Sequence, residues 1–499
     1  MQKIAIIDIG SNSIRLILAA IGQERFFKII YDQSVPVRLE EGIALDDYIS
    51  EDRIEKALST LTVFREVCSR HNPIKTIAVA TEAVRRAVNQ REFLSRVESE
   101  TGLTVRVLSG QEEAYYDYLA VVNSLHLKDG LVMDLGGGSA ELIWVADRKI
   151  VESVSLPIGA ITLSLGFEMY DRVLPEMERR LFDHLYDLYR GIPWLREIPH
   201  EHLVGVGGSF RNLGKIDRCQ KDYPLNLTHN YKLSQPDLLQ IYHLLKLQDL
   251  QQRREIKGLS GDRADIIVGA AAAITALVDF CGIKEITISG HGLREGLIYS
   301  QLFPYGGLVE DVLDYSIDSS LFYYNIDREH PCHVLNLVLS LYRQLHPLQA
   351  LDESREKVLK TAAMLHDCGI MVRYYRHHDH SFYLILNSDL NGLTHRELVQ
   401  SAHIAASHGQ QSKTAMSHYH ALISKDDIAF IKRAGVILKI ATSLDQCMDG
   451  VVDSVECQVS HDKVILKTSG RGNPELVVRA AQQVAREFKK TFKKDLLVV

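Results

Sequence analysis

Residues 4–21 read IAIIDIGSNSIRLILAAI, and residues 131–146 read LVMDLGGGSAELIWVA. In both stretches an apolar run reaches an aspartate and a glycine-serine turn, and a second apolar run follows. This pattern predicts a β-hairpin in each stretch. The motif Asp-x-Gly-x-x-Ser starts at Asp8 and again at Asp134, 126 residues later, a period too long for a solenoid. We therefore expect two half-molecules that share one plan.

Strand-like and helical patterns alternate along the rest of the first 310 residues. Residues 53–70 have helical periodicity and residues 75–80 (KTIAVA) are strand-like, an alternation typical of α/β domains. Beyond residue 311 helical patterns predict a mostly α region, at 330–346, 353–366, 395–408 and 426–447. Strand patterns return at 451–468, and a helix is expected from about residue 475. The predicted fold class is α/β with a mostly α region and a small α+β appendage, in domains 1–124, 125–310, 311–450 and 451–499.

Composition excludes several classes of protein. The 499 residues include 46% hydrophobic and 24% charged residues, as in ordinary globular proteins. The net charge of −7 argues against a chain that coats nucleic acid or an anionic membrane. The seven cysteines form no C-x-x-C pair, which favours a reducing cytosol. The apolar stretch 266–278 is too short to span a bilayer and predicts a buried helix. We expect a cytoplasmic protein with no nucleic-acid partner and no stable membrane insertion.

The two glycine turns have the composition of phosphate-binding loops. Glycine lets backbone N–H groups close around an anion, and serine and asparagine side chains add donors. Asp8 and Asp134 at the strand ends can hold a hydrated Mg²⁺ against phosphate oxygens, and Glu141 lies on the same strand face as Ser139. One such turn is more often only a tight hairpin, but two matched copies favour phosphate binding. The loop residues are Gly10, Ser11, Asn12, Ser13, Gly136, Gly137, Gly138 and Ser139.

Two strand-to-helix junctions carry further candidates. Thr81 and Arg85 flank the first turn of a predicted helix, where they would contact a bound anion. The alternative is a threonine N-cap and a surface arginine. Glu112 and Glu113 follow the strand at 104–108. Adjacent helix positions do not share a face, so only one of the two can point into a cleft. The other is solvated or caps the helix.

Six ordered motifs span the first 300 residues: DIGSNS (8–13), ATEAVRRAVN (80–89), SGQEEA (109–114), DLGGGSAE (134–141), GVGGSFRNL (205–213) and GHGLREG (290–296). With them the chain resembles the exopolyphosphatase/guanosine pentaphosphate phosphohydrolase (Ppx/GppA) family of the actin–Hsp70–sugar kinase superfamily. The resemblance implies two ribonuclease H-like, actin-like domains around a cleft. It implies that Glu113 is the general base, that Arg85 binds phosphate, and that Asp134 and Glu141, with Asp8 close by, hold Mg²⁺ or Mn²⁺. The fifth motif adds the expected phosphate-binding residues Gly207, Gly208 and Ser209.

The resemblance implies an exopolyphosphatase that releases orthophosphate from the ends of inorganic polyphosphate by attack of an activated water. The first alternative is conversion of guanosine pentaphosphate (pppGpp) to the tetraphosphate (ppGpp) at the same centre, since both substrates end in a phosphoanhydride. A regulator that binds polyphosphate or ppGpp without turnover, and an ATP-dependent sugar kinase, are weaker alternatives. A long basic groove would favour polyphosphate. The resemblance also implies a homodimer.

Thirteen of the 21 histidines lie after residue 311. His366 and Asp367, with His333 upstream and Asp445 downstream, give the order H…HD…D. This order resembles HD-type metal phosphohydrolases, in which imidazoles and carboxylates hold a divalent metal. A structural role for buried histidines is the alternative, and both stay open. Long exopolyphosphatases resemble this chain in having an HD-like domain here, associated with chain binding and dimerisation. Further candidates for the metal site are His377, His378, Asp379, His380 and His408.

The end of the chain is basic. Residues 463–499 carry a net charge of +6, whereas residues 311–462 carry −6. The pattern at 476–494 predicts a helix with an apolar stripe and with most cationic side chains off it. It is either a surface helix with solvated lysines or a positive rail for polyphosphate. The rail residues would be Arg486, Lys489, Lys490, Lys493 and Lys494.

Overall fold

The computed structural model describes residues 1–22, 24–197, 202–303, 307–345, 348, 355–409 and 416–499. The chain divides into two compact units, unit 1 (Met1–Val312) and unit 2 (Leu313–Val499). None of the helices in these described ranges is long and apolar enough to cross a membrane.

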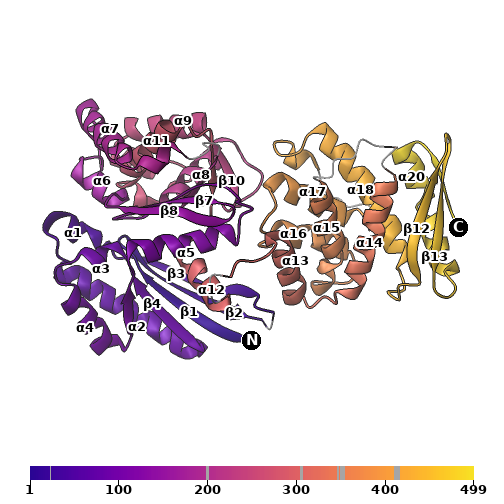
Figure 1. The fold of residues 1–499 in the computed structure, drawn as a ribbon, viewed down its shortest axis with the longest axis horizontal. Coiled ribbons are helices and arrows are strands. Elements are labelled where there is room, and N and C mark those ends of the chain that lie inside the picture. The colour runs from indigo at the N-terminus through magenta and orange to yellow at the C-terminus, as the bar shows by residue number, and fades with distance from the viewer. Residues whose placement is uncertain (23, 198–201, 304–306, 346–347, 349–354, 410–415) are drawn as a thin grey trace. The chain divides into compact units, whose positions relative to one another are not determined.

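Unit 1 contains two β-sheets built on one plan (Figure 1). The strand order is β3-β2-β1-β4-β5 in the first sheet and β10-β11-β9-β6-β7-β8 in the second. In both sheets two consecutive hairpins give three antiparallel strands, and the first strand of the three pairs in parallel with the next strand along the sheet. The first sheet consists of β1 (Gln2–Ile9), β2 (Ser13–Ile21), β3 (Phe27–Pro36), β4 (Lys75–Ala80) and β5 (Val105–Val107). The second consists of β6 (Gly130–Leu135), β7 (Ala140–Ala146), β8 (Lys149–Leu156), β9 (His202–Val206), β10 (Tyr231–Ser234) and β11 (Glu285–Ile288).

The hairpin register places the repeated motif at equivalent points of the two sheets. Asp8 lies opposite Arg15 in the β1–β2 pair, and Asp134 lies opposite Glu141 in the β6–β7 pair. The predicted hairpins and the shared plan of the two halves are therefore confirmed. The residue opposite the shared aspartate is therefore cationic in the first half (Arg15) and anionic in the second (Glu141).

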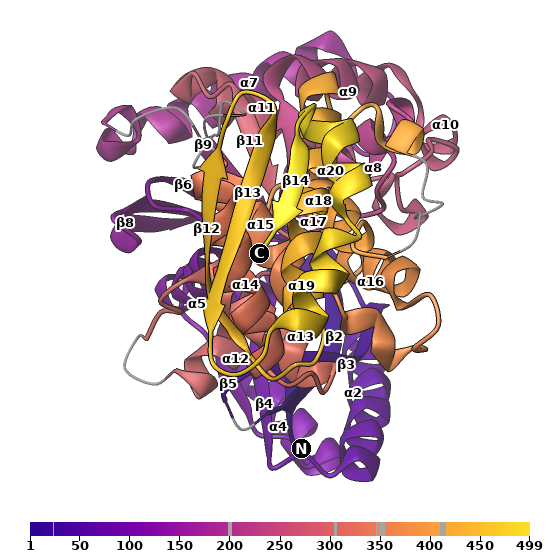
Figure 2. The ribbon, with the colours of Figure 1, turned by 90° about the vertical axis from the view of Figure 1, so that its right-hand side faces the viewer.

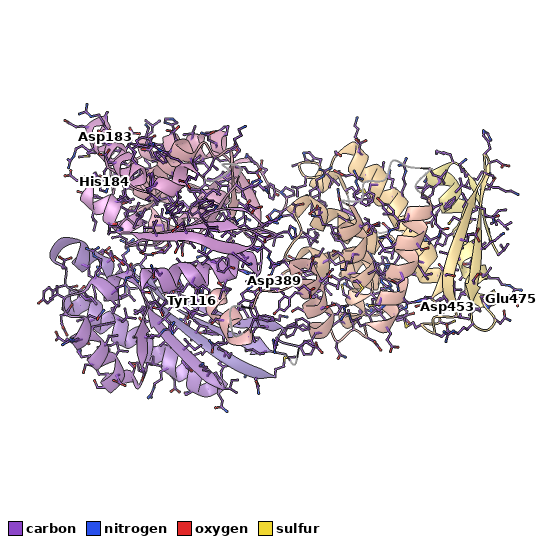
Figure 3. The ribbon with its side chains drawn as sticks, viewed as in Figure 1. Tyr116, Asp183, His184, Asp389, Asp453 and Glu475 are labelled. Atoms are coloured by element: carbon purple, nitrogen blue, oxygen red, sulfur yellow. The ribbon has the colours of Figure 1, made fainter. Side chains whose placement is uncertain are left out.

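Two helices cross between the halves. Helix α5 (Gly110–Val122) follows the first sheet but packs Leu119 and Val122 against strands of the second. Helix α12 (Leu293–Leu302) follows the second sheet but packs Leu297 against strands of the first. The two helices meet closely at Gly296, where a Cβ atom would lie 1.9 Å from the carbonyl oxygen of Tyr116, which is labelled in Figure 3. This exchange ties both sheets into one unit.

The remaining helices of unit 1 complete the two cores. The apolar stretch 266–278 forms most of α11 (Ile267–Cys281), whose residues 267–278 are all buried, so the predicted buried helix is confirmed. The other helices are α1 (Glu40–Asp46), α2 (Glu51–His71), α3 (Glu82–Arg86), α4 (Gln90–Thr101), α6 (Ala160–Gly166), α7 (Pro175–Arg190), α8 (Gly208–Gln220), α9 (Gln235–Leu247) and α10 (Leu250–Arg254).

Unit 2 is a helical bundle followed by a small sheet. Four of its helices match predicted segments, whereas α13 and α16 were not predicted. The helices are α13 (Val312–Tyr323), α14 (Glu329–Gln344), α15 (Glu356–Leu365), α16 (His377–Leu386), α17 (His395–Ala406) and α18 (Lys425–Leu444). Figure 2 shows the sheet, of order β12-β13-β14, with two helices beside it. These elements are β12 (Val452–Val459), β13 (Lys463–Gly470), α19 (Glu475–Gln482), α20 (Ala485–Phe492) and β14 (Asp495–Val498).

The last segment differs from the single helix predicted for residues 476–494. The helix is interrupted between α19 and α20, and it ends at Lys493, which has a left-handed φ of 60°. The final strand β14 then pairs in parallel with β13 and buries Leu496 and Val498. The fold class, α/β halves followed by a mostly α region and a small α+β appendage, is as expected.

Candidate active site

Two glycine loops face each other in unit 1. Each is closed by the same hydrogen bond, from Gly10 N to Ser13 O at 3.1 Å and from Gly136 N to Ser139 O at 3.0 Å. The loops approach so closely that a Cβ atom on Gly137 would lie 2.9 Å from the Cβ atom of Ser11. Glycine is required here because the two loops share one narrow space.

A third loop, between β9 and α8, completes this space. Gly207 has a φ of +97° and a ψ of 173°, a conformation open only to glycine. A Cβ atom there would lie 2.5 Å from Asp134 Oδ1, and one on Gly208 would lie 2.1 Å from Arg263. Ser209 Oγ is buried and has no hydrogen-bond partner among the described residues. The positive end of α8 and this free hydroxyl both suit an anion.

The three loops border a cleft that is open to solvent. Its lining includes most of the predicted phosphate-binding residues together with Glu113 and four arginines. The lining residues are Asp8, Gly10, Ser11, Asn12, Ser13, Arg15, Thr81, Glu113, Asp134, Leu135, Gly136, Gly137, Ser139, Val206, Gly207, Gly208, Arg211, Arg263, His291, Gly292, Leu293, Arg294 and Glu295. The structure therefore brings together side chains from both halves of unit 1.

Helix α5 directs one of its two adjacent glutamates to the cleft. Ser109 and Glu112 form a capping box: Ser109 Oγ accepts from Glu112 N, and Glu112 accepts from Ser109 N. Glu113, the next residue, is 8% exposed and lines the cleft. The expectation that only one of the pair could point inward is thus confirmed, with the other as the cap.

Glu113 is one of four buried carboxylates whose charges act on one another. Burial and the nearby Glu141 hold the pKa of Glu113 well above its usual range. Burial and the nearby Asp134 raise the pKa of Glu141 to about 8 and hold that of Asp117 well above its usual range. Burial also raises the pKa of Asp134. So many buried negative charges need a cation or protons among them.

This carboxylate group fits a divalent cation. Both carboxylate oxygens of Asp117 and Oδ1 of Asp134 are buried without a hydrogen-bond partner in the described parts of the chain. Glu141 is oriented by Ser155, whose Oγ donates to it at 2.8 Å. Oxygen ligands of this kind are those that Mg²⁺ and Mn²⁺ prefer. Asp117 escaped the sequence prediction, although it lies four residues after Glu113 and so on the same face of α5.

Arg85 contacts the catalytic candidate itself. Its Nη1 atom donates to Glu113 Oε2 at 3.2 Å and to the carbonyl oxygen of Leu108 at 2.6 Å, and its Nη2 atom pairs with Glu82. The nearby charge of Arg85 lowers the pKa of Glu113 and so opposes the effect of burial. Arg85 therefore holds Glu113 in place, and it is not among the residues that line the cleft.

Four other arginines supply positive charge to the cleft, and the sequence prediction missed all of them. Arg15 lies 3.8 Å from Asp8, and Arg294 donates to Asp32 at 2.7 Å. Burial and the neighbouring arginines lower the pKa values of Arg211 and Arg263 to about 10. Arginines that lower one another's pKa values in this way repel one another, and a polyanion bound between them would relieve that repulsion. Their signal in the sequence is weak, because they come from four distant segments.

In unit 2 the structure brings three of the four predicted HD-type residues together. His366, Asp367 and Asp445 lie around His330. The predicted His333 is three residues further along α14, and its Nε2 atom has no partner in the described residues. Sequence order could not separate the two histidines, because positions three apart lie on neighbouring parts of one helix face.

The basic residues at the C-terminus divide into two groups. Lys489 pairs with Asp495 at 2.8 Å, and Lys494 Nζ donates to two backbone carbonyl oxygens, at Ser460 and His461. Lys490 and Lys493 border a solvent-open cavity of unit 2, and Lys493 Nζ also donates to the carbonyl oxygen of Lys490. Three further cationic residues line it: Lys432, Arg433 and Lys439. Arg486 is exposed on α20.

Comparisons with known proteins agree with this arrangement. Residues 17–303 match the sequence model of the Ppx/GppA phosphatase family, and residues 313–472 match that of Ppx/GppA phosphatase, domain III. The structure is similar to that of an exopolyphosphatase from Cytophaga hutchinsonii, with 27% identity, a TM-score of 0.57, and coverage of 60% of this chain and 98% of the other. It is also similar to the Aquifex aeolicus Ppx/GppA family member, with 30% identity, a TM-score of 0.53, and coverage of 60% and 97%. The chain belongs to the Ppx/GppA phosphatase family, with the actin-like fold of its core.

Proposed function

We propose that unit 1 hydrolyses the terminal phosphoanhydride bond of inorganic polyphosphate and releases orthophosphate. One observation carries this proposal: the buried carboxylate of Glu113 lines the same cleft as two matched glycine loops and four arginines. The loops and arginines suit a chain of phosphates, and the carboxylate suits the activation of a water beside it.

The hydrolysis needs only water as co-reactant. The water oxygen forms a bond to the terminal phosphorus, the bridging P–O bond breaks, and the electron pair leaves with the shortened chain. Glu113 takes the proton from the attacking water. Burial raises the pKa of Glu113 well above its usual range, which makes its ionised form a stronger base near neutral pH. Arg85, at 3.2 Å, keeps the carboxylate oriented.

The rest of the cleft stabilises charge. The N–H groups of the glycine loops and the guanidinium groups of Arg15, Arg211, Arg263 and Arg294 would contact the phosphate oxygens, which carry the charge of the transition state. Asp134, Glu141 and Asp117 are the residues that would hold a divalent cation, Mg²⁺ or Mn²⁺. When bound, such a cation neutralises charge on the phosphate oxygens.

The cavity in unit 2 supports polyphosphate over pppGpp as substrate. Its lining includes Lys432, Arg433, Lys439, Lys490 and Lys493, together with Glu487, which pairs with Lys439, and a long polyanion can use a second cationic surface in addition to the cleft of unit 1. A single nucleotide has no such need. Both substrates present a terminal phosphoanhydride, so the cleft of unit 1 alone does not separate them.

A comparison of substrates tests this proposal. Phosphate release is measured side by side from long-chain polyphosphate, tripolyphosphate and pppGpp, with Mg²⁺ at equal concentrations of chain ends. We expect the highest kcat/KM on long-chain polyphosphate. A higher kcat/KM on pppGpp would assign the chain to the nucleotide reaction, and no release from any of the three would favour a regulator that binds without turnover.

A further inference from the structure

A cluster of side chains of the types that ligate metals lies in unit 2, at the ends of five helices. Its members come from the start of α14, the ends of α15, α17 and α18, and the start of α16. None of these residues belongs to the cleft of unit 1. The members are His330, His366, Asp367, His377, His408 and Asp445.

Asp367 is the centre of this cluster. Its Oδ2 atom lies 3.5 Å from Nε2 of His366 and 3.8 Å from Nε2 of His330. Its Oδ1 atom lies 3.1 Å from Nε2 of His377 and 3.5 Å from Nε2 of His408. Each carboxylate oxygen therefore faces its own pair of imidazole nitrogens. Within each of the two groups the ligand atoms lie within 4.8 Å of one another.

The other ring nitrogens fix the tautomer of all four histidines. Nδ1 of His366, His377 and His408 contacts the backbone carbonyl oxygen three residues earlier. Nδ1 of His330 contacts a carboxylate oxygen of Asp445 at 2.6 Å. Carbonyl and carboxylate oxygens only accept, so each Nδ1 carries the hydrogen. In neutral imidazoles the Nε2 atoms then present lone pairs.

With all four rings neutral, four lone pairs would point at one carboxylate and repel it and one another; the hydrogen bond to Asp367 raises the pKa of His377, which shows that this carboxylate attracts positive charge. Nε2 of His377 and Nε2 of His408 are only 2.9 Å apart. Protonation of the rings would relieve the repulsion, but His366 is 1% exposed and would bury its charge. Metal ions accept all five ligands at once, because two ligands each about 2.1 Å from one ion lie roughly 3 Å apart.

The turn that carries Asp367 is held rigidly. Ser381 Oγ donates to the carbonyl oxygen of His366 at 2.5 Å and accepts from Gly369 N at 2.9 Å. A Cβ atom on Gly369 would lie 2.0 Å from the carbonyl oxygen of His377. Glycine thus permits α16 to begin directly beside Asp367, and the two groups of ligands are fixed before any ion binds.

We propose that unit 2 binds two divalent transition-metal ions bridged by Asp367. The first ion is bound by His330 and His366, and the second by His377 and His408. Mixed imidazole and carboxylate ligands favour Mn²⁺, Fe²⁺, Co²⁺ or Zn²⁺ over Ca²⁺. Asp445 is a positioning residue that orients His330, in the arrangement common to metal-bound histidines. Each ion receives three protein ligands, which leaves positions for water.

Metal content tests this proposal without any assay of activity. The full chain is stripped with a chelator, dialysed against Co²⁺, and measured by elemental analysis and visible absorption. The Asp367→Asn variant is expected to hold two Co²⁺ fewer than the wild type, and His408→Gln one fewer. The matched control His333→Gln changes a neighbouring histidine outside both groups and is expected to keep the wild-type content. Equal content in all four proteins would overturn the proposal, and loss of a single ion in Asp367→Asn would overturn the bridged pair.

A measurement on the wild type alone guards against variants that fail to fold. X-ray absorption at the cobalt edge is expected to show imidazole nitrogens at about 2.1 Å from the metal. A first shell made only of oxygen atoms would mean that the ions sit on carboxylates, and it would overturn the assignment.

Discussion

Replacement of Gly207 by alanine tests the packing of the third loop against Asp134. The backbone there has a φ of +97° and a ψ of 173°, a region that costs other residues about 2 kcal/mol. The new Cβ atom would lie 2.5 Å from Asp134 Oδ1 and 2.9 Å from the carbonyl oxygen of Leu135, an overpacking worth about another 2 kcal/mol. Alanine also lowers the conformational entropy of the unfolded chain, which offsets roughly 0.5–1 kcal/mol of this loss of stability. We expect a net loss of about 3 kcal/mol in the free energy of unfolding.

Gly282→Ala is the matched control. Gly282 also has a positive φ, of +67°, but its Cβ position is open to 4 Å, so only a backbone cost of about 1 kcal/mol applies. Urea unfolding followed by tryptophan fluorescence reports on unit 1 alone, because both tryptophans, Trp144 and Trp194, lie in it. Gly207→Ala should also lose phosphate release, since Asp134 must move. Equal destabilisation by the two substitutions would refute the close contact between Gly207 and Asp134.

Three further predictions concern charge. Burial raises the pKa of Glu141 to about 8, so between the ordinary glutamate pKa and pH 8 the folded protein keeps a proton that the unfolded chain has released, and the free energy of unfolding falls as the pH rises through this range. In the presence of a chelator, the melting temperature should therefore fall less between pH 6 and pH 8 in Glu141→Gln than in the wild type. An equal fall in the two proteins would contradict this prediction. Arg211→Met should raise KM for polyphosphate yet increase the free energy of unfolding in phosphate-free buffer, because it removes one of several neighbouring cations whose charges repel one another. Arg254→Met, at an exposed arginine, is the control. A loss of stability in Arg211→Met that the control does not share would contradict the repulsion among the arginines of the cleft. Lys490→Ala combined with Lys493→Ala should lower kcat/KM several-fold on long-chain polyphosphate and leave tripolyphosphate unchanged, whereas an unchanged kcat/KM on long-chain polyphosphate would show that the unit 2 cavity plays no part in chain binding.

The parts of the fold that could be predicted are those whose signals are local. Asp8 and Asp134 with their glycine-serine turns specify two hairpins, because strand, turn and strand follow one another directly. Glu112 and Glu113 could be assigned to different directions because adjacent helix positions diverge. The structure agrees on both points.

The parts that could not be predicted depend on contacts between distant segments. Arg15, Arg211, Arg263 and Arg294 meet only because two sheets close around one cleft, and no local pattern marks them as neighbours. The exchange of α5 and α12 between the sheets likewise has no local signature. At the C-terminus the turn at Lys493 and the pairing of β14 with β13 override a helical pattern, since tertiary pairing outweighs local propensity.

The assignment of Glu113 as the base is tested most directly by phosphate release from long-chain polyphosphate by Glu113→Gln and Glu112→Gln. The two substitutions are identical in chemistry and adjacent in sequence, but Glu113 lines the cleft and Glu112 caps α5. We predict a loss in kcat on the order of 10² to 10⁴ for Glu113→Gln, and a rate close to wild type for Glu112→Gln, since glutamine also serves in a capping box. Wild-type turnover by Glu113→Gln, or an equal loss in both variants, would contradict the account.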